Sequence, residues 1–210
     1  MMEIFLIRHG ETDWNREGRY QGRTDVPLNE RGKRQAQVLA EFLYQEGISL
    51  IFSSSLKRAI ETAKPLAEKL NLDIKIRDNW IEYDFGEWEG LTIGEVISKY
   101  PEISKTWVYN TEKAKIPGGE DFLSAYQRIE KEKEFLLSNF SNEKIAIFTH
   151  GAIIRIAISV FLEIKSLGVG RLTISSCSVN HFKTNRDNRL TLVKLNYLYP
   201  HEIFSDKINP

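Results

Sequence analysis

The chain has 210 residues, and its 29 Lys and Arg against 29 Asp and Glu give a formal net charge of zero. It lacks the long-range positive field typical of nucleic-acid binders, so an anion must meet a local cluster of cations. Apolar residues make up 41% and charged residues 28%, which is typical of a globular chain. The apolar start is too short for a signal peptide and no apolar run reaches membrane-spanning length, so we expect a cytoplasmic protein without membrane or nucleic-acid partners.

Three short, nearly continuous apolar runs are typical of strands covered on both faces, as in a parallel sheet. These runs are residues 4–7, 50–52 and 145–148. Further strands are expected at residues 73–77, 179–184 and 190–195. The polar residues 185–189 separate the last two, which favours an antiparallel hairpin at one edge of the sheet.

Amphipathic patterns between these runs predict helices. The expected helices cover about residues 29–44, 55–70, 92–100, 120–140 and 152–162. Asn29 is a favourable N-cap, Thr92 with Glu95 resembles a capping box, and Pro65 predicts a kink or an early end of the second helix. Strands that alternate with helices predict an α/β fold of three layers, α/β/α, around a mostly parallel central sheet.

One segment, residues 82–119, breaks this alternation. It contains Trp88 and Trp107 and ends in Pro117-Gly118-Gly119. The sequence has no internal repeat and no linker rich in Pro, Gly or Ser. We therefore expect a single domain over residues 1–210, with residues 82–119 forming a small cap, or lid, over the end of the sheet.

The only cysteine is Cys177, so an intrachain disulfide and a thiolate metal cluster are excluded. Its setting, Ser175-Ser176-Cys177-Ser178, is compatible with a nucleophile. We interpret Cys177 as a buried, inert thiol, because free cysteine is among the most buried residue types.

Two of the four histidines, His9 and His150, each follow an apolar strand and precede a glycine. In open α/β sheets, ligands bind at the carboxyl ends of strands, so a polar residue followed by a closely packing glycine suits a binding site there. A lone histidine of this kind is better explained as a strand end bonded to the backbone. A pair of them, with Arg8 beside His9, favours a functional site.

Arginines near the strand ends indicate a phosphate pocket. Arg8 precedes His9, and a second expected strand leads through Ser53-Ser54-Ser55 to Arg58. Guanidinium groups match phosphate oxygens in a bidentate geometry, and the free amides at a helix start also favour anions. Six other arginines are interpreted as solvated surface groups: Arg31, Arg34, Arg77, Arg128, Arg186 and Arg189.

Five motifs follow one another over residues 4–162. They are Leu6-Ile7-Arg8-His9-Gly10-Glu11-Thr12 with Asn15, residues 20–28, residues 53–63, residues 82–90, and Thr149-His150-Gly151. In this order they resemble the histidine phosphatase (phosphoglycerate mutase-like) superfamily. The resemblance implies a phosphomonoester hydrolase that acts on small phosphorylated metabolites through a phosphohistidine, with no metal and no other cofactor.

The resemblance also implies a role for individual residues. His9 would attack phosphorus through one ring nitrogen while the other donates to a backbone carbonyl, which fixes the tautomer. Arg8, Arg58 and His150 would hold the phosphoryl oxygens and offset their charge. The implied substrate-binding residues are Asn15, Gln21, Gly22 and Gly151.

A leaving alkoxide needs a proton, which a nearby carboxyl group can supply. The residues by themselves leave four candidates: Glu82, Asp84, Glu87 and Glu89. The resemblance selects Glu82, whose apolar and aromatic neighbours indicate partial burial.

Two other functions stay open. In a phosphoglycerate mutase, a second hydroxyl of the substrate takes the phosphoryl group in place of water. Residues 85–90 resemble the phosphatase branch, which includes alpha-ribazole phosphatases and broad-specificity phosphatases, and the chain lacks the insertion typical of cofactor-dependent mutases between Glu82 and His150. Hydrolysis is therefore favoured. A catalytically silent module that binds phosphate or protein is disfavoured, because His9 and Glu82 are both present.

The sequence departs from the family pattern in two places. Asp121 stands where a serine often follows Pro-Gly-Gly-Glu, and Ala152 stands where a second glycine often follows His-Gly. An added carboxylate near the pocket mouth would disfavour highly anionic substrates. The sequence does not decide which metabolite is the substrate or whether the chain forms a homodimer.

Overall fold

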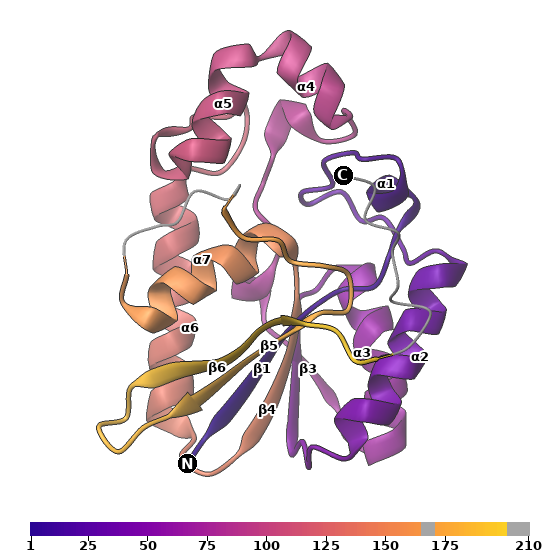
Figure 1. Ribbon diagram of the computed structural model, residues 1–210, viewed down its shortest axis with the longest axis vertical. Coiled ribbons are helices and arrows are strands. Elements are labelled where there is room, and N and C mark those ends of the chain that lie inside the picture. The colour runs from indigo at the N-terminus through magenta and orange to yellow at the C-terminus, as the bar shows by residue number, and fades with distance from the viewer. Residues whose placement is uncertain (165–170, 201–210) are drawn as a thin grey trace.

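The computed structural model describes residues 1–164 and 171–200 (Figure 1). Over these residues the chain forms one six-stranded sheet with the strand order β3-β2-β4-β1-β5-β6. The strands are β1 (Glu3–Arg8), β2 (Leu50–Ser53), β3 (Ile74–Ile76), β4 (Lys144–Thr149), β5 (Val179–Thr184) and β6 (Leu190–Tyr197). The first four are parallel, and β5 and β6 form an antiparallel hairpin at one edge. The predicted α/β fold is confirmed.

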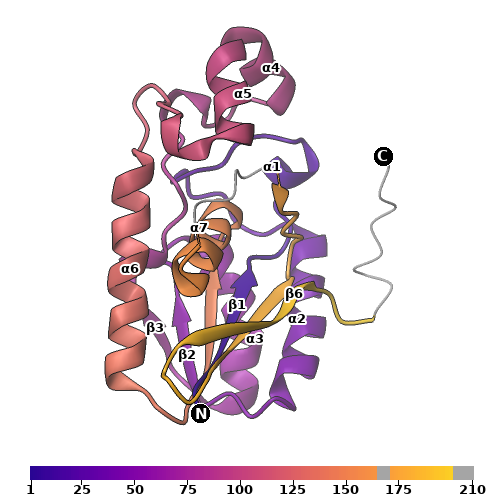
Figure 2. The ribbon, with the colours of Figure 1, turned by 60° about the vertical axis from the view of Figure 1, so that its left-hand side comes forward.

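Helices cover both faces of the sheet (Figures 1 and 2). They are α2 (Glu30–Tyr44) and α3 (Lys57–Leu70) on one face, and α6 (Phe122–Asn139) and α7 (Gly151–Leu162) on the other. Because side chains alternate along a strand, Phe5 and Ile7 of β1 pack in the cluster with α2 and α3, whereas Ile4 and Leu6 pack with α6 and α7. In the part of the chain that the structure describes, no helix is both long enough and apolar enough to cross a membrane.

Pro65 lies inside helix α3, so the early end of this helix, one of the two expected effects of the proline, does not occur. Helix α3 continues to Leu70 because residues on both sides of the proline, Ala63 and Leu66, are buried against the sheet. This burial offsets the hydrogen bond that the proline cannot make.

Residues 82–119, the segment expected to form a lid, lie above the carboxyl ends of the strands and contain α4 (Ile93–Lys99) and α5 (Pro101–Tyr109) (Figures 1 and 2). Thr92 caps α4 through the expected capping box. Helix α5 was not expected; it starts at Pro101, a residue that suits the first helical position. Below the two helices, the ring of Trp107 lies 4.8 Å from that of Tyr83 and 5.3 Å from that of Phe85. These aromatic residues join the segment to the hydrophobic cluster that also contains α6 and α7.

Arg77 and Arg128 are not the solvated groups that were expected. Arg77 donates two hydrogen bonds, of 2.6 and 2.9 Å, to the buried carboxylate of Glu132. Arg128 donates two, of 2.9 and 3.0 Å, to Glu120, whose side chain is only 8% exposed. The interpretation failed because neither carboxylate is a helix neighbour of its arginine: Glu132 lies 55 positions from Arg77, and Glu120 lies eight positions before Arg128 and outside α6. Arg31 is also paired, with Glu11 at 2.6 Å, while Arg34, Arg186 and Arg189 are exposed as predicted.

We predict that Arg77→Leu lowers the free energy of unfolding by about 3 kcal/mol, because it leaves the Glu132 carboxylate buried without its cation. The double variant Arg77→Leu/Glu132→Leu should lose less than Arg77→Leu. Urea unfolding of both, with Lys75→Ala on exposed β3 as the control, measures the difference. If the free energy of unfolding of Arg77→Leu lies within about 0.5 kcal/mol of that of the parent, the pair contributes little to stability.

Candidate active site

His9 and His150 lie side by side at the carboxyl ends of neighbouring strands. Strands β1 and β4 pair in parallel with Arg8 opposite Thr149, so the next residue of each strand lies at the same edge. The two imidazole centres are 5.2 Å apart, and both side chains are buried. The structure thus brings together the two histidines on which the site prediction rests.

The His9 ring is neutral and fixed in one tautomer. Its Nδ1 donates to the Gly10 carbonyl at 2.7 Å, so the lone pair is on Nε2. Burial, together with the positive charges of Arg58 and Arg8, lowers the pKa of His9 well below its ordinary value. The ring therefore offers an unprotonated nitrogen at neutral pH.

Cationic side chains surround the two rings, and Arg8 and Arg58 make no ion pair with a carboxylate of the described residues. Arg58 is fully buried and donates to the carbonyls of Gly22 and Thr24 at 2.6 and 2.8 Å, and Arg8 donates to the carbonyl of Ile174. Burial lowers the pKa of Arg58 to about 10, so it stays charged at neutral pH. Backbone oxygens orient these guanidinium groups but leave their charge in place.

Three buried nitrogens in this group make no hydrogen bond within the described residues: Arg8 Nε, Arg58 Nε and His150 Nδ1. The other nitrogen of His150 lies 2.7 Å from the Ser54 hydroxyl. A buried polar atom left unpaired costs about 1–3 kcal/mol, so a cluster of them calls for a functional explanation. An anion that accepts from all three would supply the missing bonds.

A cavity of about 310 Å³ opens beside His9. Six of the predicted site residues line it: Arg8, His9, Asn15, Gln21, Glu82 and Gly151. Arg58, His150 and Gly22 are not part of its lining. Gly22 instead contributes its carbonyl to the orientation of Arg58.

Among the four acidic candidates, only Glu82 lines the cavity. It is 8% exposed, and its carboxylate accepts from the backbone N–H groups of Ala152 and Ile153, at 3.4 and 3.3 Å, at the start of α7. Asp84 instead accepts from Gly86 N at 2.9 Å, and Glu87 accepts from the Tyr100 hydroxyl. The carboxylates of Asp84 and Glu87 therefore make their contacts outside the cavity.

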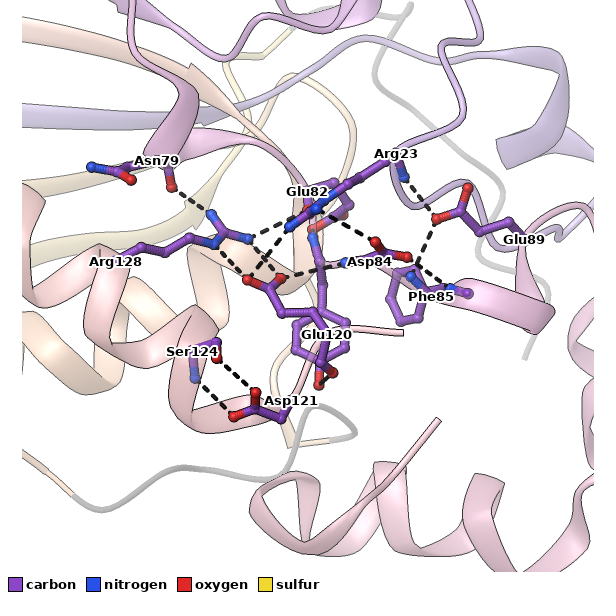
Figure 3. Close-up of polar contacts among 12 residues, drawn as sticks. Arg23, Asn79, Glu82, Asp84, Phe85, Glu89, Glu120, Asp121, Ser124 and Arg128 are labelled. Carbon is purple, nitrogen blue, oxygen red and sulfur yellow. Dashed lines mark hydrogen bonds and ion pairs between the residues drawn. The ribbon is translucent and has the colours of Figure 1, made fainter. Parts of the chain in front are cut away.

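The backbone that carries Glu82 is held by Arg128, as Figure 3 shows. Besides its two bonds to Glu120, this guanidinium donates to the carbonyls of Asn79 and Glu82. Arg128, paired with Glu120, therefore connects the first turns of α6 to the backbone at Asn79 and at Glu82.

Asp121 does not add a carboxylate to the pocket mouth, contrary to expectation. It is the N-cap of α6 and accepts from the N–H and hydroxyl of Ser124 at 2.9 and 2.6 Å (Figure 3). Capping turns its side chain toward the helix, and Asp121 is not among the residues that line the cavity.

Glu89 clamps the loop that orients Arg58. Its carboxylate accepts from the backbone N–H groups of Arg23, Thr24 and Phe85, at 2.9, 3.0 and 3.2 Å, and from the Thr24 hydroxyl at 2.6 Å. Gly22 has φ +53° and packs so tightly that a Cβ there would lie 1.9 Å from a Glu89 oxygen. The sequence offered Glu89 only as a competing acid, so this role was missed.

Arg155 is a further residue that the sequence analysis missed. It lines the cavity and lies four positions after Gly151 on α7, a spacing that puts both on one helix face. A Cβ at Gly151 would lie 3.4 Å from Arg155 Nη1 and 3.5 Å from Arg8 Nε. Gly151 thus leaves room for two guanidinium groups, and its helical spacing to Arg155 was the available signal.

Cys177 is a buried thiol, as predicted. It is 1% exposed, and burial raises its pKa far above the ordinary value. Its backbone N–H donates to the Arg8 carbonyl at 3.0 Å, next to the site but outside the cavity lining.

Comparison with known proteins places the chain in a family. The model of the histidine phosphatase superfamily (branch 1) matches residues 4–197, and the chain belongs to this family. It is 41% identical to phosphoserine phosphatase 1 of Hydrogenobacter thermophilus over 150 residues, and this aligned region covers 71% of each chain. It is 39% identical over 156 residues to phosphoglycerate mutase-like protein 4 of Arabidopsis thaliana, covering 73% of this chain and 68% of that one.

Solved structures agree with this placement. The mycobacterial glucosyl-3-phosphoglycerate phosphatase in complex with VO3 matches with a TM-score of 0.85 at 27% identity, over 92% of this chain and 98% of that one. The chain spans 53% of the length of three mycobacterial relatives that it also matches. The family predicted from the ordered motifs is confirmed.

We predict that Glu89→Gln lowers kcat/KM at least about tenfold, because an amide cannot accept from all four donors and the loop under Arg58 loses its anchor. The matched control is Glu87→Gln, whose carboxylate contacts Tyr100 at the exposed surface and not the loop. Steady-state kinetics on p-nitrophenyl phosphate measures both variants. Equal activities would show that the clamp is dispensable.

Proposed function

We propose that this protein hydrolyses phosphate monoesters of small metabolites through a covalent phosphohistidine on His9. The observation that carries the proposal is a neutral imidazole of fixed tautomer at the wall of a cavity, surrounded by buried cations with unpaired N–H groups. Such an arrangement combines a nucleophile with charge stabilisation for a phosphoryl group.

In the first step, Nε2 of His9 attacks phosphorus and the bond from phosphorus to the ester oxygen breaks. Arg8, Arg58 and His150 donate to the equatorial oxygens, where negative charge is spread in the transition state. The leaving alkoxide takes a proton from the Glu82 carboxyl group. The guanidinium groups supply the charge compensation that metal ions supply in many other phosphotransferases.

In the second step, the Glu82 carboxylate takes a proton from water, which attacks the phosphohistidine. The phosphorus–nitrogen bond breaks, inorganic phosphate leaves, and His9 returns to its neutral state. Asn15 and Gln21 complete the substrate cradle in this proposal. The Asn15 side-chain oxygen accepts from Thr12 at 3.1 Å, which leaves its amide N–H groups for the substrate.

The substrate is proposed to be a small phosphorylated metabolite, as the names phosphoserine phosphatase and glucosyl-3-phosphoglycerate phosphatase suggest for two relatives. The mutase-like relative keeps intramolecular transfer as the second candidate. Incubation with 3-phosphoglycerate and 2,3-bisphosphoglycerate separates the two, since a hydrolase releases phosphate and a mutase isomerises without release. We further propose that the chain acts in the cytoplasm as one domain whose lid, residues 82–119, covers the site.

We predict that His9→Ala lowers turnover at least about a thousandfold, because no other side chain can take over the covalent step. Radiolabelled substrate should yield an acid-labile, base-stable adduct on the parent protein and none on the variant. A chelator should leave parent activity unchanged. Thermal unfolding of both proteins checks that the fold is intact. Normal turnover by a folded His9→Ala protein would refute the mechanism.

Glu82→Gln should slow the hydrolysis of alkyl phosphates by about 100-fold or more, since poor leaving groups depend on protonation. Hydrolysis of p-nitrophenyl phosphate, whose leaving group is stable as an anion, should fall much less. The ratio of the two kcat/KM values therefore reports the acid. If both substrates slow to the same extent, the proton comes from another group.

A further inference from the structure

Arg155 is a partly buried cation that lines the cavity, and the proposed reaction does not use it. It comes from the first turns of α7, and its Nε donates to the Leu172 carbonyl at 2.8 Å. Burial lowers its pKa to about 10, so the guanidinium remains charged at neutral pH. The cavity therefore contains a positive charge besides those assigned to the phosphoryl group.

Within residues 1–164 and 171–200, no carboxylate lies in salt-bridge contact with Arg155. The carboxylate whose charge acts on it is that of Glu82, the proposed acid. The acid is uncharged when the ester bond breaks, because it has a proton to give. In that state no carboxylate among the described residues balances the charge of Arg155, so an anionic group of the substrate can pair with it.

Tyr20 adds a hydroxyl to the same part of the cavity. It lines the cavity, and its phenol is close enough to Arg155 for the two groups to interact electrostatically. Edge contacts with Phe85 and Trp88, at ring-centre distances of 4.9 and 5.1 Å, hold the Tyr20 ring in place. A guanidinium and a phenol on rigid supports form a suitable pair of donors for one anionic group.

The distance between this pair and the phosphoryl site is short. Arg155 Nη1 and Arg8 Nε lie 3.4 and 3.5 Å from the position that a Cβ atom on Gly151 would occupy, so the two guanidinium groups are close to each other. A molecule that reaches both guanidinium groups therefore carries its two anionic groups only a few bonds apart.

We propose that Arg155 and Tyr20 bind a carboxylate of the substrate, so that short phosphate esters of hydroxy acids or amino acids are preferred. The proposal rests on the proposed hydrolysis and adds the class of molecule that is hydrolysed. A planar guanidinium matches the two oxygens of a carboxylate, and an additional charged hydrogen bond strengthens binding about 10- to 100-fold.

The test compares two substrates that differ only in the carboxylate, O-phosphoserine and O-phosphoethanolamine. The parent protein should prefer O-phosphoserine at least about tenfold in kcat/KM. Arg155→Met should lose this preference through a higher KM for O-phosphoserine, so that kcat/KM falls at least about tenfold more for O-phosphoserine than for O-phosphoethanolamine. Arg155→Lys should restore part of the preference, and Arg34→Met, at an exposed arginine, is the control.

Several outcomes would overturn the proposal. They are equal parent activity on both substrates, an equal loss on both in Arg155→Met, or a loss by that variant on 2,3-bisphosphoglycerate alone, which would assign Arg155 to a second phosphoryl group. Thermal unfolding shows whether Arg155→Met is merely destabilised. In that case the substrate preference of Arg155→Lys decides whether the charge at position 155 matters. Failure of the proposed function is a separate result, seen as no turnover of p-nitrophenyl phosphate by the parent.

Discussion

The parallel pairing of β1 with β4 is the constraint on which the site depends. It places Arg8 opposite Thr149, so that the residues just beyond the two strands, His9 and His150, meet although they are far apart in the sequence. Both strands are buried between two layers of helices, and the two imidazoles at their ends are buried as well. The proximity of the two imidazoles and their burial therefore both follow from this single pairing.

Low dielectric determines the protonation of the site. Burial disfavours the charged form of His9, and the neighbouring arginines disfavour it further, so the ring stays a nucleophile. The arginines keep their charge because guanidinium is a very strong base, and backbone carbonyls rather than carboxylates fix their positions. A carboxylate partner would have cancelled the field that a phosphoryl group needs. The positive charge is therefore available to a substrate.

Acidic residues between positions 82 and 120 differ in what their carboxylates contact. Glu82 alone lines the cavity, and Glu89 anchors the loop that orients Arg58. Glu120, paired with Arg128, supports the backbone on which Glu82 stands. These residues have the same chemistry, yet their environments differ: one carboxylate faces the cavity, as the proposed acid must, and two hold backbone segments in place.

The sequence by itself determined the order of strands and helices, because burial on both faces of a sheet leaves continuous apolar runs and amphipathic helices leave a period of 3.6. It also determined His9 and its neighbours as site candidates, since glycine and polar residues at strand ends are local signals. Tertiary structure alone decided the partner of Arg77, the role of Glu89, and the contacts of Arg128 with the carbonyls of Asn79 and Glu82. Each of these depends on which distant carboxylate or backbone group lies within hydrogen-bond reach, and periodicity along one element carries no information about that distance.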